Sequence, residues 1–361
     1  MVSDADYMRR ALFHARRAEG VTTPNPLVGA IVVTAAGVVV GQGRHPRAGA
    51  PHAEVFALQD AGARARGATL YVTLEPCCHH GRTGPCTGRI IAAGITRVVA
   101  AMADPNPLVC GQGVAELQAH GIQVEVGLLG DEAARLNRAF TVVQTKGRPM
   151  VIVKAASSLD GKMAAKPGVR TPLTSAQANR RTQRLRGAVD AIAVGSGTVL
   201  ADDPVLTARD CHRLRPLARV VFDRRLRTPA AARLFSTLGA GPVIIITTAE
   251  AIARHPENAE ALRLAGGNLV AGTGELRTDV RALLAWDIST LLLEGGGAMH
   301  AAAWQAGIVD RVIVIMAPTV LGEQGARLFD GLPVAMSQLI PVRVETIGPD
   351  AWMEADVHGD Y

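Results

Sequence analysis

Three residues of metal-binding type stand at spacings that suit a catalytic zinc site. His52 is followed two positions on by Glu54, and Cys77 and Cys86 lie nine positions apart later in the chain. One imidazole and two thiolates are donors that Zn²⁺ prefers, and a catalytic site leaves the fourth position to water. Glu54 is too near His52 in sequence to bind the same ion easily, but it can reach that water. The pattern predicts zinc ligands at His52, Cys77 and Cys86 and a proton shuttle at Glu54.

The chemistry expected of such a site is hydrolytic deamination. Zinc lowers the pKa of bound water toward 7, so that hydroxide is available at neutral pH. Hydroxide adds to an amino-bearing ring carbon while Glu54 moves the proton to the ring nitrogen and then to the departing ammonia. A structural zinc knot built from Cys77, Cys78, Cys86 and a histidine is the alternative. The glutamate beside His52 favours the catalytic interpretation.

The elements that must hold these residues alternate between helices and strands. Helical spacing of apolar residues predicts helices over 7–19, 52–67 and 86–94, and a Gly-containing turn joins two strands, 28–33 and 35–43, into a hairpin. Strand patterns follow at 68–76 and from 96. His52 and Cys86 therefore fall at helix N-termini, where the helix dipole favours thiolate. Alternation of this kind predicts a layered α/β fold.

A second α/β domain is expected after the Gly- and Pro-containing segment 142–149. Short β-branched runs recur there at 188–197, 217–223, 241–248, 289–297 and 311–318. We therefore predict two domains, 1–148 and 149–361. In the second, Lys154 stands near a strand end, and Thr198, Asp202 and Arg209 are expected in a long loop after a strand.

Composition narrows the class of protein. The 361 residues are 48% hydrophobic and 19% charged, which excludes intrinsic disorder, and the apolar runs are strand-sized, so we expect no membrane span. The first residues carry charges throughout, and we expect no secretion signal.

The five cysteines, an odd number, indicate a reducing compartment, and we therefore expect a cytoplasmic location. Cys110 and Cys211 are expected to be buried apolar residues. A net charge of +6 suits an anionic small substrate.

The motifs around the expected zinc ligands also resemble a known family. His-Ala-Glu followed by Pro-Cys resembles the zinc nucleoside and nucleobase deaminases. The string TLEPCCHHGRTGPC at 73–86 is similar to the bifunctional deaminase-reductases of riboflavin biosynthesis, as are PNPLVGAIVV at 24–33, GRHPRAGAPHAEVFAL at 43–58 and ADPNP at 103–107. The resemblance runs through residues 7–140.

This resemblance implies a cytidine-deaminase-like three-layer domain whose ligands are His52, Cys77 and Cys86, with Cys78 not a ligand. It implies deamination of 2,5-diamino-6-(5-phosphoribosylamino)pyrimidin-4-one. The residues implied to line the pyrimidine and ribose-phosphate pocket are Asn25, His45, His79, Arg82, Asp104 and Asn106. Asn25 and Asn106 also suit Pro-flanked turns for backbone reasons alone, and Arg82 suits a solvated surface.

Three strings of the second domain, VIVKAASSLDGKMA at 151–164, VGSGTVLADDPVLTAR at 194–209 and LLLEGGGAMH at 291–300, resemble the reductase half of the same family. That half is similar to dihydrofolate reductase, uses NADPH and reduces the ribosyl group to ribityl. Lys154 is implied to stand at the reacting ribose. Substrate contacts are implied for Arg186, Leu206, Arg209 and Glu294. Cofactor contacts are implied for Ala156, Pro172, Thr198, Asp202, Gly296, Gly297, Ala298, Met299, His300, Ala301 and Ala302.

Two features of the second domain bear on the cofactor. Glycines at a strand-to-helix junction, such as 295–297, let backbone N–H groups approach a phosphate, although close packing explains many such glycines. Where the family usually has Trp-Ile-Thr, this chain has Pro172-Leu173-Thr174, and Arg170 replaces a small polar residue. The aromatic side chain that the family usually places near the cofactor is therefore missing. The affinity for the cofactor, and the preference between NADPH and NADH, depend on what replaces it.

Two other classes of function compete with this bifunctional enzyme. An RNA-binding deaminase acting on a flipped adenosine would need a basic face and stacking aromatic residues, but only 3% of the residues are aromatic. A zinc scaffold without catalysis would need no glutamate beside the histidine. We therefore expect a phosphorylated pyrimidine as partner, with neither nucleic acid nor membrane, and the sequence leaves a homo-oligomer open.

Overall fold

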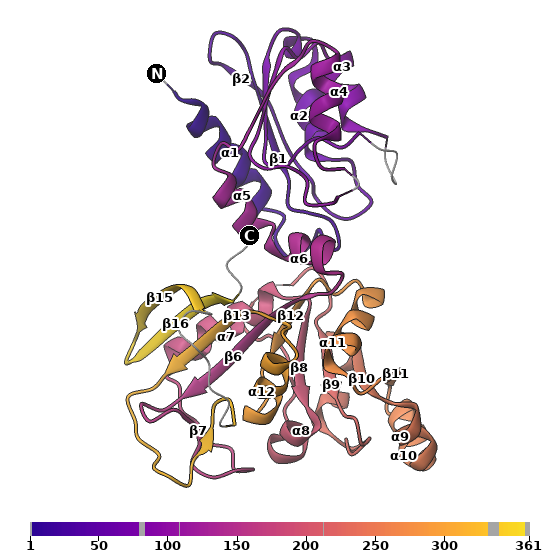
Figure 1. Ribbon diagram of the computed structural model, residues 1–361, viewed down its shortest axis with the longest axis vertical. Helices are drawn as coiled ribbons and strands as arrows, with labels where there is room; N and C mark the ends of the chain where they lie inside the picture. Colours follow the sequence, from indigo (N-terminus) through magenta and orange to yellow (C-terminus); the bar gives the residue numbers. More distant parts are fainter. Residues whose placement is uncertain (1, 79–83, 108, 212, 331–338, 358–361) are drawn as a thin grey trace. The chain divides into compact units, whose positions relative to one another are not determined.

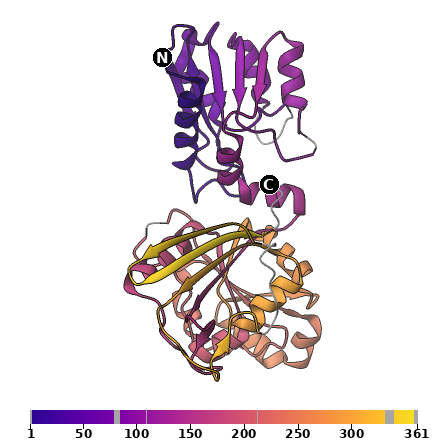
Figure 2. The same ribbon diagram turned by 60° about the vertical axis from the view of Figure 1, so that its left-hand side comes forward.

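The computed structural model describes residues 2–78, 84–107, 109–211, 213–330 and 339–357. Within these residues the chain divides into two compact units, one ending at Gly147 and one beginning at Arg148 (Figures 1 and 2). The break lies one residue from the predicted boundary. Arg148 belongs to the second unit because its guanidinium forms two hydrogen bonds, of 2.5 and 2.8 Å, with the buried Asp310 carboxylate.

The N-terminal unit is built on a sheet with the strand order β2-β1-β3-β4-β5. The predicted hairpin is present, since β1 and β2 pair antiparallel, and the β3-β4 and β4-β5 pairs are parallel. The strands are β1 (Gly29–Val33), β2 (Val39–Arg44), β3 (Thr69–Val72), β4 (Arg97–Ala100) and β5 (Gln123–Val126).

Helices cover both faces of this sheet, as the predicted three-layer architecture requires (Figure 1). One core joins the sheet to α2, α3 and α4, and a second joins it to α1 and α5. The helices are α1 (Asp4–Arg16), α2 (Ala53–Ala61), the 3₁₀ helix η1 (Gly62–Ala65), α3 (Cys86–Ala92), α4 (Gln112–Ala119), α5 (Gly130–Leu136) and α6 (Arg138–Lys146).

Helix α2 lies unusually close to β2, and two glycines make this approach sterically feasible. A methyl group on Gly43 would stand 2.3 Å from the carbonyl oxygen of Ala53, and one on Gly41 would stand 2.1 Å from that of Ala57. Neither distance is compatible with a side chain. Glycine at positions 41 and 43 therefore allows α2 to lie in this position. The helix begins directly after His52.

The C-terminal unit contains a sheet with the order β11-β10-β9-β8-β12-β6-β13-β16-β15 and a small ribbon of β7 and β14. In this order, every two neighbouring strands from β11 through β13 pair in parallel. Strands β16 and β15 continue the sheet beyond β13 and pair antiparallel. The strands are β6 (Met150–Ser157), β7 (Lys162–Ala164), β8 (Ala191–Gly195), β9 (Ala218–Phe222), β10 (Val243–Thr248), β11 (Gly267–Gly272), β12 (Thr290–Leu293), β13 (Val309–Met316), β14 (Ala326–Arg327), β15 (Leu339–Ile347) and β16 (Asp350–Val357).

Helices connect the parallel strands of this unit. The core on one face of the sheet includes Val280 and Leu283 of η3 and Ala303 of α12. The helices are α7 (Ala176–Ala188), α8 (Ser196–Asp202), η2 (Arg233–Ala240), α9 (Ala249–Arg254), α10 (Pro256–Leu264), α11 (Leu276–Asp279), η3 (Val280–Trp286) and α12 (Gly297–Gln305).

Two sequence-based expectations are wrong. The segment expected as a long loop after β8 begins with helix α8, which carries Thr198 and Asp202, because Gly195 takes an extended N-cap conformation and the helix continues to a left-handed Asp203. Cys110, expected to be a buried residue, is exposed, and Cys211 is half-buried.

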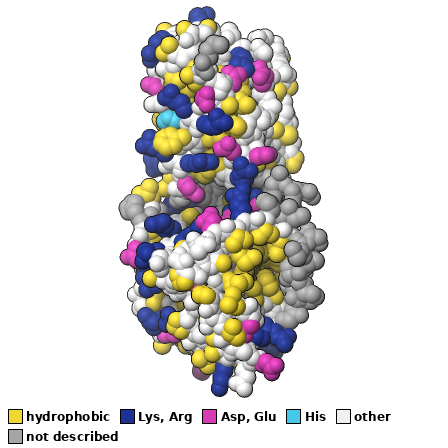
Figure 3. All heavy atoms as spheres, turned by 90° about the vertical axis from the view of Figure 1, so that its left-hand side faces the viewer, with side chains coloured by type: hydrophobic (Ala, Val, Ile, Leu, Met, Phe, Trp, Pro, Cys, Tyr) yellow, Lys and Arg dark blue, Asp and Glu magenta, His cyan; other side chains and the backbone are white. Residues whose placement is uncertain are grey.

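Strand β15 forms one edge of the sheet and exposes apolar side chains. Val342 and Val344 are exposed, and hydrophobic side chains gather on this side of the C-terminal unit (Figure 3). Within the described residues, no helix is long and apolar enough to cross a membrane.

We predict that Gly43→Ala weakens the fold and the metal site together. The added methyl group must push the first turn of α2 away from β2, at a cost of about 1–3 kcal/mol. Thermal unfolding and zinc content per chain should both decrease. Gly88→Ala is the matched control, because a methyl group at Gly88 meets nothing within 4 Å. Equal unfolding temperatures and zinc contents in the two variants would contradict this account.

Candidate active sites

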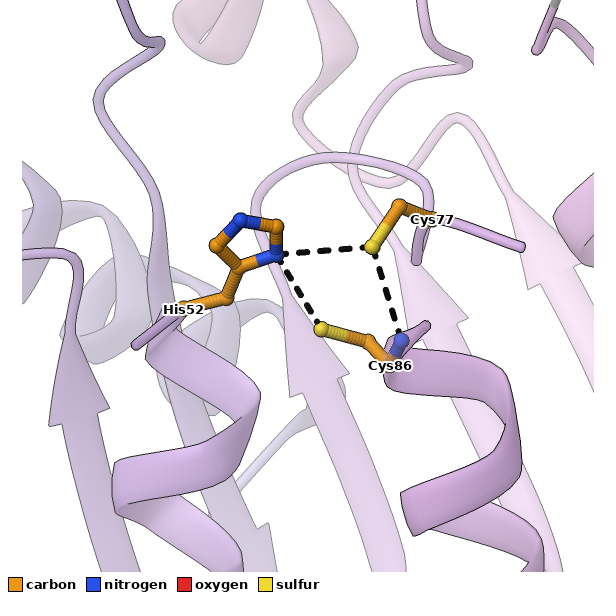
Figure 4. Close-up of side chains that lie close together, drawn as sticks. All are labelled: His52, Cys77 and Cys86. Carbon is orange, nitrogen blue, oxygen red and sulfur yellow. Dashed lines mark hydrogen bonds between the residues drawn. The ribbon is translucent and has the colours of Figure 1, made fainter. Parts of the chain in front are cut away.

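The three predicted zinc ligands lie together in the structure. The Nδ1 atom of His52 is 3.2 Å from Cys86 Sγ and 3.4 Å from Cys77 Sγ, and all three ligand atoms lie within 4.8 Å of one another (Figure 4). His52 is the N-cap of α2, Cys86 is the first residue of α3, and Cys77 lies in the segment after β3. The predicted placement of His52 and Cys86 at helix N-termini is therefore confirmed.

The surroundings of Cys77 favour a thiolate. Hydrogen bonding by the Cys86 thiol, opposed by burial and supported by His52 and the Cys86 backbone N–H, lowers the pKa of Cys77 to about 4. That backbone N–H, in the first turn of α3, lies 3.4 Å from Cys77 Sγ. A thiolate at a helix N-terminus is a strong ligand for a soft or borderline cation.

This donor set fits zinc. Tetrahedral zinc separates neighbouring N and S ligand atoms by roughly 3.5 Å, close to the two distances from His52 Nδ1. Cys78 is not part of the cluster, and its Sγ instead lies 4.0 Å from Gln112 Oε1. Among the described residues the cluster has three ligands, which favours a catalytic site over a structural zinc knot.

Glu54 lies on the first turn of α2, next to the cluster, and its carboxyl group is buried. Burial raises the pKa of Glu54, and the Cys77 thiolate raises it further. Its Oε2 atom has no hydrogen-bond partner among the described residues. A buried carboxyl group with an uncommitted oxygen and a raised pKa is suited to take up and release a proton.

His45 and Asn25 form one wall beside the cluster. The His45 ring packs edge-on against the His52 ring at 5.6 Å, and its Nδ1 lies 3.1 Å from the Pro51 carbonyl oxygen. Because a carbonyl can only accept, Nδ1 carries the proton, and Nε2 accepts from Asn25 Nδ2 at 3.0 Å. Burial lowers the pKa of His45, which keeps this neutral form. The bond leaves the Asn25 carbonyl oxygen for other partners.

Asp104 and Asn106 are held by a residue that the sequence analysis did not identify. The buried Glu75 carboxylate accepts the backbone N–H groups of Asp104 and Gly111 through Oε2, both at 3.0 Å. Its Oε1 accepts those of Gly113 and Val114, at 3.1 and 3.3 Å. Asp104 Oδ1 in turn accepts the Asn106 N–H at 2.9 Å. One carboxylate thus holds the backbone at Asp104 and, further along the chain, at Gly111 and at the first turn of α4.

A second anchor holds the segment of Asn25. The buried Asn137 amide accepts from Leu27 N at 2.8 Å and donates to Leu27 O at 3.0 Å. Neither Glu75 nor Asn137 has a local sequence signal for this role, apart from the position of Glu75 within the TLEPC string. His79 and Arg82 lie outside the described residues.

In the C-terminal unit, a cavity of about 1220 Å³ lies at the carboxyl ends of the parallel strands. Open α/β sheets usually bind ligands at this edge. Lys154 and Glu294 line the cavity, together with these residues expected to contact the cofactor: Ala156, Thr198, Asp202, Gly296, Gly297, Ala298, Met299 and Ala302.

A charged group lies at the β6–β12 end of the cavity. Burial lowers the pKa of Lys154, with Glu294 opposing this shift. Burial also acts to raise the pKa of Glu294, but Lys154 and Arg186 outweigh it and hold this pKa below its usual range. Arg186 grips Glu294 through Nε and Nη2, at 3.0 and 2.5 Å, and donates from Nη1 to the Thr207 carbonyl.

The three glycines before α12 have different roles. A methyl group on Gly295 would meet Met299 Cβ at 2.7 Å, and one on Gly297 would meet the Arg327 carbonyl oxygen at 2.2 Å. These two glycines serve close packing. Gly296 has nothing within 4 Å, so it is the one that leaves room for a ligand at the helix N-terminus.

Several predicted contacts do not line this cavity. They are Pro172, His300 and Ala301 among the cofactor residues, and Arg186, Leu206 and Arg209 among the substrate residues. His300 is fully buried beside Phe329, and Leu206 is buried with a φ of 55°. Arg209 is exposed, and its backbone N–H donates to Gln183. Arg170, in contrast, does line the cavity.

Known proteins match nearly the full length of the chain. The family description "RibD C-terminal domain" matches residues 149–353, and "Cytidine and deoxycytidylate deaminase zinc-binding region" matches residues 1–102. The riboflavin biosynthesis protein RibD of Aquifex aeolicus is 41% identical over 351 residues, which cover 96% of each chain. The chain belongs to the RibD family.

Other RibD proteins are similar to this chain over nearly its full length. RibD of Escherichia coli is 41% identical and covers 91% of each chain. The solved structure of Acinetobacter baumannii RibD has a TM-score of 0.85 at 35% identity and covers 98% of this chain and 99% of its own. The Thermotoga maritima deaminase/reductase has a TM-score of 0.85 at 34% identity, with 98% of each chain covered. The chain is thus a bifunctional RibD enzyme with a cytidine-deaminase-like zinc domain and a dihydrofolate-reductase-like domain.

We predict that Glu75→Gln impairs substrate binding for deamination while zinc stays bound. The amide nitrogen cannot accept, so two of the four loop N–H groups lose their partner and Asp104 and Asn106 shift. KM for deamination should rise about 10-fold, with zinc content unchanged. Glu116→Gln on α4 is the matched control. An unchanged KM, or loss of zinc together with activity, would show that the loop does not depend on Glu75 in this way.

Proposed function

We propose that the N-terminal unit deaminates 2,5-diamino-6-(5-phosphoribosylamino)pyrimidin-4-one, and that the C-terminal unit reduces the ribosyl group of the product to ribityl with NADPH. The Thermotoga maritima relative carries the corresponding name, a diaminohydroxyphosphoribosylaminopyrimidine deaminase/5-amino-6-(5-phosphoribosylamino)uracil reductase. The observation that carries the proposal is the His52-Cys77-Cys86 cluster with the buried, uncommitted Glu54 oxygen beside it.

In the N-terminal unit, His52, Cys77 and Cys86 hold zinc, which supplies Lewis-acid activation of water when bound. Glu54 would take one proton of the attacking water and pass it to the ring nitrogen as the oxygen adds to the ring carbon. It would then take the remaining proton of the added hydroxyl and pass it to the amine, which leaves as ammonia when the carbon–nitrogen bond breaks. Burial raises the pKa of Glu54 above its usual range, which favours the uptake and release of a proton by this carboxyl group.

Residues outside the metal cluster bind the substrate. The free carbonyl oxygen of Asn25 suits a donor on the pyrimidine ring, and His45 fixes that orientation. Asp104 and Asn106, held by Glu75, face the same substrate. His79 and Arg82 lie outside the described residues, and we propose them as further substrate contacts, because the guanidinium of Arg82 suits the substrate phosphate.

In the C-terminal unit, NADPH supplies a hydride, and the cavity beside Gly296 suits an extended dinucleotide. Reduction opens the ribosylamino ring and adds the hydride to the carbon attached to nitrogen. Lys154 and Glu294 stand at the reacting ribose, where Lys154 supplies a proton and Glu294 binds ribose hydroxyls. The bidentate contact from Arg186 orients Glu294. Leu206 and Arg209 contact the rest of the substrate.

The cofactor contacts proposed for this unit are Ala156, Pro172, Thr198, Asp202, Gly296, Gly297, Ala298, Met299, His300, Ala301 and Ala302. Those of His300 and Ala301 run through the backbone of α12, since both side chains are buried. A cytoplasmic location fits the free cysteines of the described residues. The exposed valines of the edge strand β15 favour a homo-oligomer.

We predict that Glu54→Gln keeps zinc and loses deamination. The substituted amide cannot carry a proton, so ammonia release should decrease at least 100-fold, while metal analysis shows one zinc per chain. Glu19→Gln, at an exposed position, is the matched control. Full activity in Glu54→Gln would remove this residue from the proposed mechanism.

We predict that Cys77→Ser abolishes zinc binding and deamination but spares reduction. The serine hydroxyl is a poor zinc ligand, whereas the residues around the cavity all lie in the other unit. NADPH oxidation on substrate that is already deaminated should stay within about twofold of the wild type. Cys78→Ser is the control and should keep both activities. Loss of reduction in Cys77→Ser would argue against two independent sites.

A further inference from the structure

Arg186, which orients Glu294, lies two residues before the end of α7. The last carbonyl groups of an α-helix have no partner within the helix. Many helices end in a left-handed residue, after which backbone N–H groups turn back to these carbonyls, but the C-cap residue of α7, Val189, is extended. The helix end that carries Arg186 therefore needs hydrogen-bond donors from another segment.

Arg213 supplies these donors. Its Nη1 donates to the carbonyl oxygen of Arg186 at 3.0 Å and to that of Gly187. Its Nε donates to the carbonyl oxygen of Arg215 at 3.2 Å, which fixes the guanidinium on its own segment. The guanidinium also brings a positive charge to the C-terminus of α7, where the helix dipole favours a cation.

The segment before Arg213 packs closely on the C-terminal part of α7. The backbone N–H of Arg209 donates to Gln183 Oε1 at 2.8 Å, and the Cys211 thiol donates to Gln183 O at 3.6 Å. A methyl group on Gly187 would stand 2.9 Å from Cys211 Sγ, so glycine at this position allows the close approach. Arg213 is therefore held where its guanidinium reaches the end of the helix.

The same segment also holds the side chain of Arg186. Its Nη1 donates to the Thr207 carbonyl at 3.1 Å, while Nε and Nη2 donate to the Glu294 carboxylate. Among the described residues, both hydrogen bonds of that carboxylate come from Arg186. A displacement of the Arg186 backbone would therefore move the carboxylate that lines the cavity with Lys154.

We propose that Arg213 is a positioning residue of the reductase, which holds the last turn of α7 so that Arg186 keeps Glu294 in place at the reacting ribose. Arg213 does not line the cavity, so its effect reaches the reaction through Arg186. Hydride transfer needs the ribose carbon at a fixed place relative to the cofactor, and a small displacement of Glu294 lowers its rate. This inference rests on the proposed reductase function and adds to it a residue outside the cavity.

The test is the steady-state rate of NADPH oxidation on deaminated substrate by the zinc-loaded full-length chain. Arg213→Met keeps most of the hydrocarbon stem and removes the donors and the charge. In this variant kcat should fall about 10-fold, while KM for NADPH stays within about twofold of the wild type. In Arg213→Lys, whose ammonium can still donate to the helix carbonyls, kcat should return to within about threefold of the wild type.

Arg277→Met is the matched control. The Nε of Arg277 also donates to a carbonyl at a helix end, that of Ala306 at the C-cap of α12, at 2.8 Å. Arg277 is exposed and does not line the cavity. Its substitution should lower the unfolding temperature by an amount similar to that of Arg213→Met and leave kcat unchanged. Thermal unfolding, and ammonia release by the N-terminal unit of the same preparation, check that each variant is folded.

A double-mutant cycle tests the route through Arg186. In Arg186→Lys the paired contacts with Glu294 are already lost, so adding Arg213→Met should change kcat by less than about twofold. If the two effects multiply instead, Arg213 does not act through Arg186 and the inference is overturned. Should Arg213→Met fail to fold, Arg213→Gln, whose shorter amide carries no charge, takes its place in the same cycle.

The outcomes separate this inference from the proposed function. An unchanged kcat in Arg213→Met, or an equal decrease in Arg277→Met, overturns the role of Arg213 and leaves the reductase intact. If the wild type does not oxidise NADPH with the deaminated substrate, the proposed reduction fails and this inference fails with it.

Discussion

The N-terminal site depends on one packing constraint, the contact between the backbone of α2 and the glycines of β2. That contact sets where α2 begins and hence where His52 and Glu54 lie. Cys86 begins α3, and its N–H and that of Thr87 both bond to the Cys77 carbonyl, which ties α3 to the segment after β3. Two helix N-termini and one loop thus meet at a single point. A metal site of three ligands needs this rigidity, because each ligand comes from a different segment.

Glu54, Glu75 and Glu294 have different roles because their hydrogen-bond partners differ. Glu75 accepts four backbone N–H groups and has no capacity left for chemistry, so it shapes a loop. Glu294 is held by the two parallel bonds of Arg186, which keep it charged and fixed beside Lys154. Glu54 has an oxygen without a hydrogen-bond partner among the described residues and a raised pKa, and together these allow it to take up and release a proton. Glu54 and Glu75 are both buried, so burial alone does not separate their roles, and the hydrogen bonds decide the function.

Residue type and the predicted helix starts led from the sequence to the metal cluster, and the family resemblance then implied that Cys78 is not a ligand. The sequence was not sufficient for Glu75 and Asn137, since their partners are backbone groups of segments 29 to 110 positions away, which leave no pattern in side-chain types. The prediction of a long loop over 194–209 was wrong in its first part, because Ser196–Asp202 forms helix α8 with Gly195 as its N-cap. The glycines at 295–297 suggested phosphate binding, whereas two of them are required by close packing.

The described residues of each proposed site lie within one unit. The described residues of the deaminase site precede Gly147, and the lining of the reductase cavity follows Arg148. The deaminated intermediate keeps its phosphoribosyl group, so two separate sites must recognise the same phosphate. Arg186 cannot easily serve this purpose in the reductase, because all three arms of its guanidinium are bonded to Glu294 and Thr207. The exposed Arg209 has a free side chain among the described residues, and it is therefore the better candidate for the substrate phosphate.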